Sequence, residues 1–67
     1  MKILCERIKE LRQEKGLSAV QLAKEINVSD SAIIRWENAQ RLPNIMALVA
    51  LAKYFGVTLD YLVGLED

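Results

Sequence analysis

Apolar residues recur along the chain at helical spacing, with polar and charged residues between them. Within residues 2–15, Leu4, Ile8 and Leu11 follow one another at intervals of four and three, and Gly16 comes directly after this segment. The pattern predicts an amphipathic helix that buries one face and ends at the glycine. A second helix is expected after Ser18, because Gln21 three residues on completes a capping box.

Residues 22–37, LAKEINVSDSAIIRWE, have the spacing of two packed helices joined by a tight turn. Ala23 is small enough for the second helix to pass close over the first. Asn27 tolerates the left-handed backbone conformation that ends a helix. Val28 and Ile33 would fill the angle between the two helices. We therefore interpret this stretch as a helix-turn-helix.

The second helix of this motif is predicted from Asp30 to about Asn38, with Ser29 as its N-cap. It should end before the segment AQRLP, because Pro43 disfavours helical geometry in the residue before it. A longer helix with an apolar stripe is expected after Asn44, up to Gly56. A short helix should then run from Thr58 to Gly64.

The predicted fold is all-α, a compact arrangement of five helices in a single domain of residues 1–67, with the helix-turn-helix at helices two and three. Loops of two to six residues require neighbouring helices to pack around one core. The residues expected in that core are Leu4, Ile8, Leu11, Leu17, Leu22, Ala23, Ile26, Val28, Ile33, Leu48, Leu51, Ala52, Phe55, Val57 and Leu62.

Composition excludes most enzyme classes. The chain has no histidine and a single cysteine, Cys5, which we expect to be a small packing residue. The usual zinc-ligand and acid–base sets are therefore missing, and no metal, cofactor or small-molecule ligand is expected. No apolar run approaches the roughly 18 residues of a membrane span, and the charged start MKILCERIKE is unlike a secretory signal. We expect a cytoplasmic protein with no membrane partner.

The net charge of zero is unusual for a protein that binds nucleic acid, because contacts from Lys and Arg to phosphate supply most non-specific affinity. The charges are unevenly distributed, however. Residues 1–43 hold eight basic and six acidic side chains, whereas residues 44–67 hold one basic and three acidic. The part that contains the helix-turn-helix is therefore mildly positive.

Four blocks of the sequence, in order, resemble the phage-repressor type of helix-turn-helix domain, the lambda-repressor-like or Cro-type fold. The blocks are RIKELRQEKGLS, LAKEINVS, IIRWENAQRLPN and LAKYFGVTLDYL, and together they cover nearly the whole chain. The resemblance implies a transcriptional regulator that binds double-stranded DNA. It is expected to be a repressor that occupies a palindromic operator as a homodimer.

The resemblance also implies which residues read bases, because the second helix of the motif lies in the major groove in this family. Those residues are Asp30, Ser31, Ala32 and Arg35, with Ile34 flanking them. Arg35 can form two hydrogen bonds with guanine O6 and N7. Asp30 has two open interpretations: it could accept from cytosine N4 or simply favour the positive end of the helix dipole.

Phosphate contacts implied by the resemblance come from the starts of both helices of the motif and from the loop after it. The corresponding residues are Ser18, Ala19, Ser29, Asn38, Gln40 and Arg41. The family usually has glutamine in place of Ala19 and glycine in place of Ala39. The first departure removes a side chain that would contact phosphate, and the second implies a different end to the helix.

Two further expectations concern residues outside the reading face. Relatives form a partly buried ion pair at the positions of Arg12 and Glu37, with two unrelated surface charges as the alternative. Trp36 is expected to pack in or beside the core and not to stack on a base. Apolar residues near the end of the chain are candidate dimer contacts, namely Tyr61, Val63 and Leu65, as are Met46, Val49 and Ala50 on the fourth helix. The alternative for these apolar residues is the ordinary scatter found on monomers.

A protein-interaction module, such as an antitoxin or antirepressor with the same fold, is the competing function. The zero net charge, Asp30 and the missing glutamine at position 19 favour it to some extent. Salt-dependent binding to duplex DNA separates the two functions, because a module that binds only protein should show none.

Overall fold

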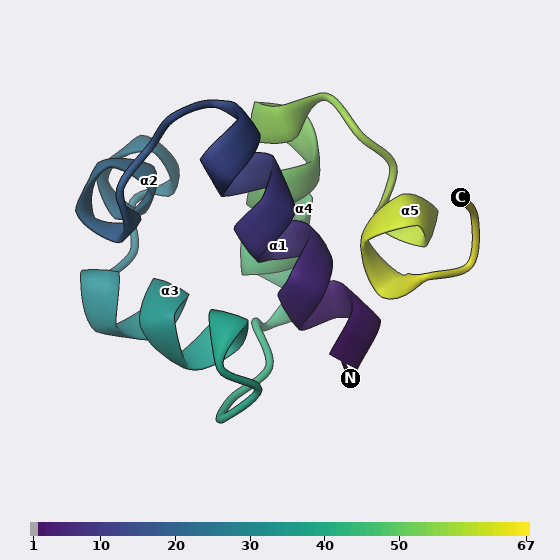
Figure 1. Ribbon diagram of the computed structural model, residues 1–67, viewed down its shortest axis with the longest axis horizontal. Coiled ribbons are helices and arrows are strands. Elements are labelled where there is room, and N and C mark those ends of the chain that lie inside the picture. The colour runs from purple at the N-terminus through teal and green to yellow at the C-terminus, as the bar shows by residue number, and fades with distance from the viewer. Residues whose placement is uncertain (1) are drawn as a thin grey trace.

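The computed structural model describes residues 2–67, and within this range the chain forms five helices (Figure 1). They are α1 (Lys2–Glu14), α2 (Ala19–Ile26), α3 (Asp30–Glu37), α4 (Ile45–Phe55) and α5 (Leu59–Val63). This part of the chain contains no strand, and none of its helices is long and apolar enough to cross a membrane. The prediction of an all-α, five-helix fold is confirmed.

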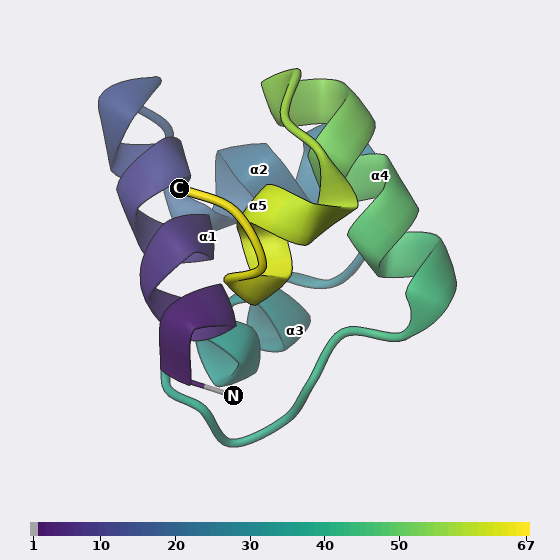
Figure 2. The same ribbon diagram turned by 90° about the vertical axis from the view of Figure 1, so that its right-hand side faces the viewer.

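The helices are arranged so that α3 and α5 lie on different sides of the molecule. Helix α1 crosses in front of α4, with α2 and α3 on one side and α5 on the other (Figure 1). Seen from the side, α5 lies between α1 and α4 and packs against both (Figure 2). Helix α3 packs mainly against α1 and α2, and several of its residues are exposed to solvent.

One fully buried aliphatic side chain from each helix meets in the core. These side chains are Ile8, Leu22, Ile33, Leu51 and Leu62. The other core residues predicted from the sequence are buried as well, or are partly buried and packed against this cluster. Cys5 and Trp36 are buried, as their packing interpretation requires, and Ala47 is a buried residue that the sequence pattern missed.

Capping side chains start four of these helices. Ser18 accepts the N–H of Gln21 at 3.1 Å, and its own N–H donates to the Gln21 side chain at 2.8 Å, which completes the predicted capping box. Each of the next three helices begins with one side-chain oxygen that accepts the backbone N–H three residues further on. Ser29 accepts from Ala32, Asn44 accepts from Ala47, and Thr58 accepts from Tyr61. The predicted helix starts are therefore confirmed.

The end of α3 contains an alanine in the left-handed region, with φ of 59° at Ala39. The N–H of Gln40 donates to the carbonyl oxygen of Arg35 at 2.9 Å, and that of Ala39 donates to Trp36 at 3.4 Å. This pair of bonds is a Schellman motif, whose C′ position is usually glycine because a Cβ is strained there. Ala39 was expected to change the end of α3, but the Schellman turn is kept, with backbone strain at Ala39.

We expect the substitution Ala39→Gly to stabilise the domain by about 0.5–1 kcal/mol, because relief of left-handed strain exceeds the added freedom of the unfolded chain. Thermal unfolding followed by circular dichroism should show a rise of roughly 4 °C. The matched control is Ala50→Gly inside α4, which should lower the melting temperature. A fall of similar size in both variants would contradict the strain at Ala39.

Candidate nucleic-acid interface

The turn between α2 and α3 has the geometry expected of a helix-turn-helix. Asn27 ends α2 in the left-handed conformation, with φ of 61° and ψ of 48°, as its position in the sequence predicts. The N–H of Val28 then donates to the carbonyl oxygen of Ala23 at 2.9 Å. Ala23 is buried where the two helices pack, so its small side chain allows their close approach.

Helix α3 has a buried face and an open face. Ile33 and Trp36 point into the core with exposures of 0% and 5%, which assigns the tryptophan to packing. Of the four residues expected to read bases, three are exposed, namely Asp30, Ser31 and Arg35. The fourth, Ala32, is partly buried and packs against the core.

A groove of about 690 Å³ runs beside the open face of α3. Arg35 from the helix and Arg41 from the following loop line it together with Ser29 and Ser31, and apolar groups such as Met46 form other parts of the wall. Its lining includes two cationic side chains and no acidic one. The zero net charge of the chain therefore coexists with a local positive surface next to α3.

Of the remaining residues expected to contact phosphate, Ser29 lines this groove, whereas the others lie outside its lining. Ser18 and Ser29 use their side-chain oxygens as helix caps, and each hydroxyl retains a proton that it can donate outward. Ala19 is partly buried against the core, so it offers only its backbone N–H. Asn38 and Gln40 are exposed at the end of α3.

Asp30 occupies the first turn of α3 and accepts the N–H of Ser31 at 3.0 Å through Oδ1. A carboxylate in this position satisfies a free helix N–H and interacts favourably with the positive end of the helix dipole. This contact supports the interpretation of Asp30 as a residue that stabilises the helix start.

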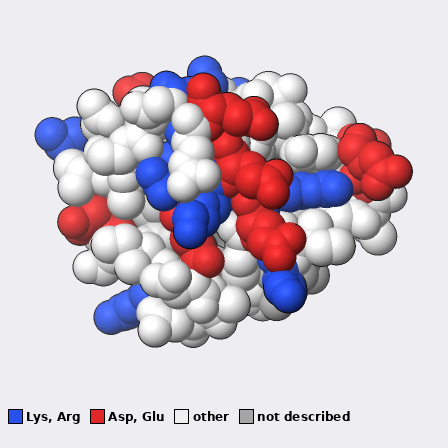
Figure 3. All heavy atoms as spheres, in the orientation of Figure 1, with Lys and Arg blue, Asp and Glu red and all other residues white. Residues whose placement is uncertain are grey.

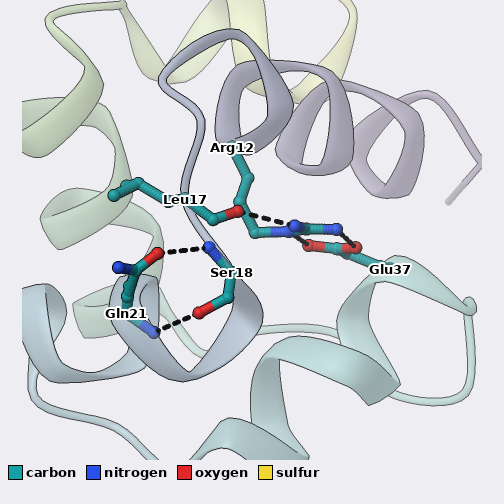
Figure 4. A network of polar contacts seen from close by, with 5 residues as sticks. All are labelled: Arg12, Leu17, Ser18, Gln21 and Glu37. Atoms are coloured by element: carbon teal, nitrogen blue, oxygen red, sulfur yellow. Dashed lines mark hydrogen bonds and ion pairs between the residues drawn. The ribbon is translucent and has the colours of Figure 1, made fainter.

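Arg12 and Glu37 form an ion pair between α1 and the last residue of α3 (Figure 4). Arg12 Nε and Nη2 donate to the two carboxylate oxygens of Glu37 at 2.6 and 2.9 Å, and Nη1 donates to the carbonyl oxygen of Leu17 at 2.8 Å. The side chains are only 16% and 9% exposed. Each of the three guanidinium nitrogens therefore donates one hydrogen bond to the scaffold, which assigns Arg12 to structure and not to a ligand.

The hydrogen bond to Glu37, assisted by the charge of the carboxylate, raises the pKa of Arg12 above its ordinary value despite the opposing effect of burial. Because the pKa is raised on folding, the resulting stabilisation is fully present below the ordinary pKa of arginine. It is lost only as the pH rises through the folded value. The pair thus holds throughout the neutral range.

The outer face of α1 has mixed charge. A row of acidic groups runs over this helix with basic groups beside it (Figure 3). Charges of both signs at close range cancel within about one Debye length, roughly 8–10 Å at moderate salt. This face consequently offers no broad positive surface to a polyanion.

The three candidate dimer contacts near the end of the chain have different environments. The Arg7 guanidinium lies 4.1 Å from the ring centre of Tyr61 and donates to the carbonyl oxygens of Tyr61 and Glu66, the latter at 2.7 Å. One face of the tyrosine is therefore covered within the chain. Val63 is half-buried, whereas Leu65 is 76% exposed.

A second group of exposed apolar side chains lies between α3 and the start of α4, where Leu42, Ile45 and Met46 are 54%, 63% and 75% exposed. The sequence pattern singled out only Met46 from this group. No charged residue occurs between positions 42 and 52. That uncharged stretch is the signal that could have identified the others.

The five-helix arrangement, the helix-turn-helix and the partly buried pair from α1 to α3 define a phage-repressor-like DNA-binding domain class. A family model described as helix-turn-helix matches residues 8–62. The chain belongs to this family, which confirms the resemblance seen in the sequence.

Two regulators illustrate the relationship in sequence. The HTH-type transcriptional activator BcrR of Enterococcus faecalis is 39% identical over 62 residues, which cover 92% of this chain and 30% of the activator. The immunity repressor protein of Bacillus phage phi105 is 36% identical over 61 residues, covering 91% of this chain and 42% of the repressor. The chain thus spans less than half the length of either relative.

A solved structure extends the relationship to the fold. The P22 c2 repressor, in a crystal structure with a synthetic operator, superposes with a TM-score of 0.86 and 34% identity. The match covers 92% of this chain and 94% of that one. These relatives and the structural neighbour are named as regulators and not as enzymes, in agreement with the prediction from composition.

We expect the substitution Arg12→Ala to lower the free energy of unfolding by about 3 kcal/mol, because it leaves the carboxylate of Glu37 largely buried without its partner. The melting temperature should fall by roughly 10 °C or more. Lys9→Ala removes an exposed charge from the same helix and should change the melting temperature little. Equal melting temperatures for the two variants would contradict this role for the pair.

Proposed function

We propose that this domain binds double-stranded DNA in a sequence-specific manner, with α3 in the major groove, as part of a transcriptional regulator. The observation that carries the proposal is the groove beside α3, whose lining contains Arg35 and Arg41 and no acidic side chain. DNA is the polyanion that a helix beside such a groove fits. A P22 c2 repressor of the same fold has been solved with an operator, which supports the assignment.

Within this proposal, base reading is divided among residues of α3. Arg35 donates two hydrogen bonds to a guanine, a contact worth about 1–3 kcal/mol of discrimination. Ser31 contacts a neighbouring base with less selectivity. Asp30 mainly stabilises the start of the helix, and Ala32, being partly buried, contributes shape close to the groove.

Phosphate contacts position the domain on the duplex without reading sequence. We assign them to Arg41, to the free hydroxyl protons of Ser18 and Ser29, and to the exposed amides of Asn38 and Gln40. Ala19 takes part through its backbone N–H at the start of α2, since a helix N-terminus attracts anions.

We further propose that residues 1–67 act as one DNA-binding domain in the cytoplasm, that the protein binds as a homodimer, and that it represses by occupying a palindromic operator. Half-sites in successive turns of one DNA face lie about 34–36 Å apart. The backbone of the domain extends 28 Å along its longest axis, which suits one copy of the protein on each half-site. Leu65 is the most exposed of the predicted dimer contacts and the best candidate for the centre of the interface.

A protein-interaction module is the second candidate function. The uncharged, exposed group of Leu42, Ile45 and Met46 favours it, since apolar patches mark contact surfaces. The tests below separate the two candidates, because a module that binds only protein enriches no DNA sequence.

Selection from a randomised pool of duplex DNA should enrich a defined sequence. Relative to the unchanged protein, Arg35→Ala should relax base preference at one position of that sequence, at a cost of about 1–3 kcal/mol. Arg41→Ala should instead weaken binding to all sequences and reduce the slope of log K against log salt by about one.

The control for simple loss of charge is Lys53→Ala, in the last turn of α4 and outside the groove, which should alter neither property. If Arg41→Ala changed sequence preference while Arg35→Ala did not, the assigned roles would be reversed. Absence of any enriched sequence would exclude the proposed function.

Sedimentation of the complex with a selected operator should give two copies of the protein on two half-sites whose centres are about 10 base pairs apart. Leu65→Lys should shift the assembly towards monomer, because a lysine introduced into an apolar contact is desolvated. Met46→Lys alters the alternative dimer candidate on α4, which has nearly equal exposure, and so compares the two surfaces. A monomeric complex would rule out the dimer, and an effect confined to Met46→Lys would move the contact to α4.

A further inference from the structure

Ile34 is a large apolar side chain on the open face of α3, with an exposure of 47%. It lies four residues after Asp30 and three after Ser31, so helical spacing places it on the same side as these polar residues. Its neighbour Arg35 is also exposed. The surface proposed to meet base edges therefore has an aliphatic group near its middle.

The fold gives no reason for an isoleucine at this position. The side chain is not part of the core cluster or of the group packed against it, and β-branched residues are not favoured in exposed helix positions. The backbone carbonyl of Ile34 accepts the N–H of Asn38 at 3.0 Å, a bond that any residue could provide. The exposed methyl groups of Ile34 are therefore available to contact an apolar group of a ligand.

We infer that Ile34 is a specificity-determining residue that contacts the C5 methyl group of a thymine next to the guanine read by Arg35. The inference rests on the proposed function and goes beyond it by assigning a base to a residue. Thymine presents the one methyl group among the major-groove edges of the four bases. An aliphatic side chain against that methyl buries apolar surface on both partners.

Other bases at the same position are disfavoured by the same side chain. Cytosine lacks the methyl group and presents an amino donor, and the purines present polar atoms. Isoleucine can form no hydrogen bond with these groups and removes water from them, which is costly. Ile34 thus selects for thymine partly by rejecting the alternatives.

The test uses the operator selected above with each thymine replaced in turn by deoxyuridine, which removes the methyl group and keeps base pairing. At the position in each half-site that is adjacent to the guanine whose preference Arg35→Ala relaxes, the unchanged protein should bind about fourfold more weakly. The Ile34→Ala variant should bind the thymine and deoxyuridine duplexes with equal affinity. The ratio of the two dissociation constants is the quantity compared.

Ile3→Ala is the matched control, because Ile3 is 45% exposed on α1 and outside the proposed interface. It should keep the fourfold ratio, whatever its effect on stability. An unchanged affinity at every deoxyuridine position, or a ratio that persists in Ile34→Ala, would overturn the inference while the proposed function stands. Failure of the unchanged protein to bind any duplex would overturn both.

Discussion

The ion pair between Arg12 and Glu37 is the constraint on which the orientation of α3 depends. One guanidinium holds both carboxylate oxygens at the end of α3 and the carbonyl oxygen of Leu17. Leu17 immediately precedes the capping box that starts α2. The planar guanidinium donates in three fixed directions, which a lysine cannot reproduce. Three elements are therefore oriented by a single side chain (Figure 4).

This constraint extends to the groove beside α3. Arg12 fixes Glu37, the last residue of α3. In the Schellman motif that follows, the N–H of Gln40 donates to the carbonyl oxygen of Arg35. Because the chain turns back at once, Arg41 comes to line the same groove as Arg35. The left-handed conformation of Ala39 is required by this tight return. The position of Arg41 in the groove and the strained backbone of Ala39 thus both result from this tight turn.

Much of the fold was predictable because its signals are local. A capping oxygen lies three residues from the N–H that it accepts, so Ser18 could be assigned as an N-cap from the sequence. Asn27 was likewise assigned to the helix end from its own backbone preference. Buried residues repeat every three or four positions, which identified Ile33 as a core residue. The site was less predictable. A shift of one position around a helix turns a side chain by 100°. The family resemblance placed Ala32 among the base-reading residues and Ile34 beside them, whereas Ala32 is partly buried and Ile34 is exposed. Arg7 covers Tyr61 across 54 residues of sequence, a distance that no local pattern reports.

The low net charge has a consequence for how such a domain would find its site. Affinity for arbitrary DNA comes mainly from phosphate neutralisation, and here the groove beside α3 is lined by two cationic side chains in a chain with no net charge. Weak non-specific binding leaves fewer copies held at competing genomic sites, so the ratio of specific to non-specific affinity matters more than affinity alone. In the proposed complex, direct contacts from α3 would supply most of the discrimination, and a dimer on one operator would multiply it without added charge. An aliphatic side chain such as Ile34 fits this mode of recognition. Its contribution to the binding free energy would come from contact with a methyl group, and it would not strengthen binding to phosphate.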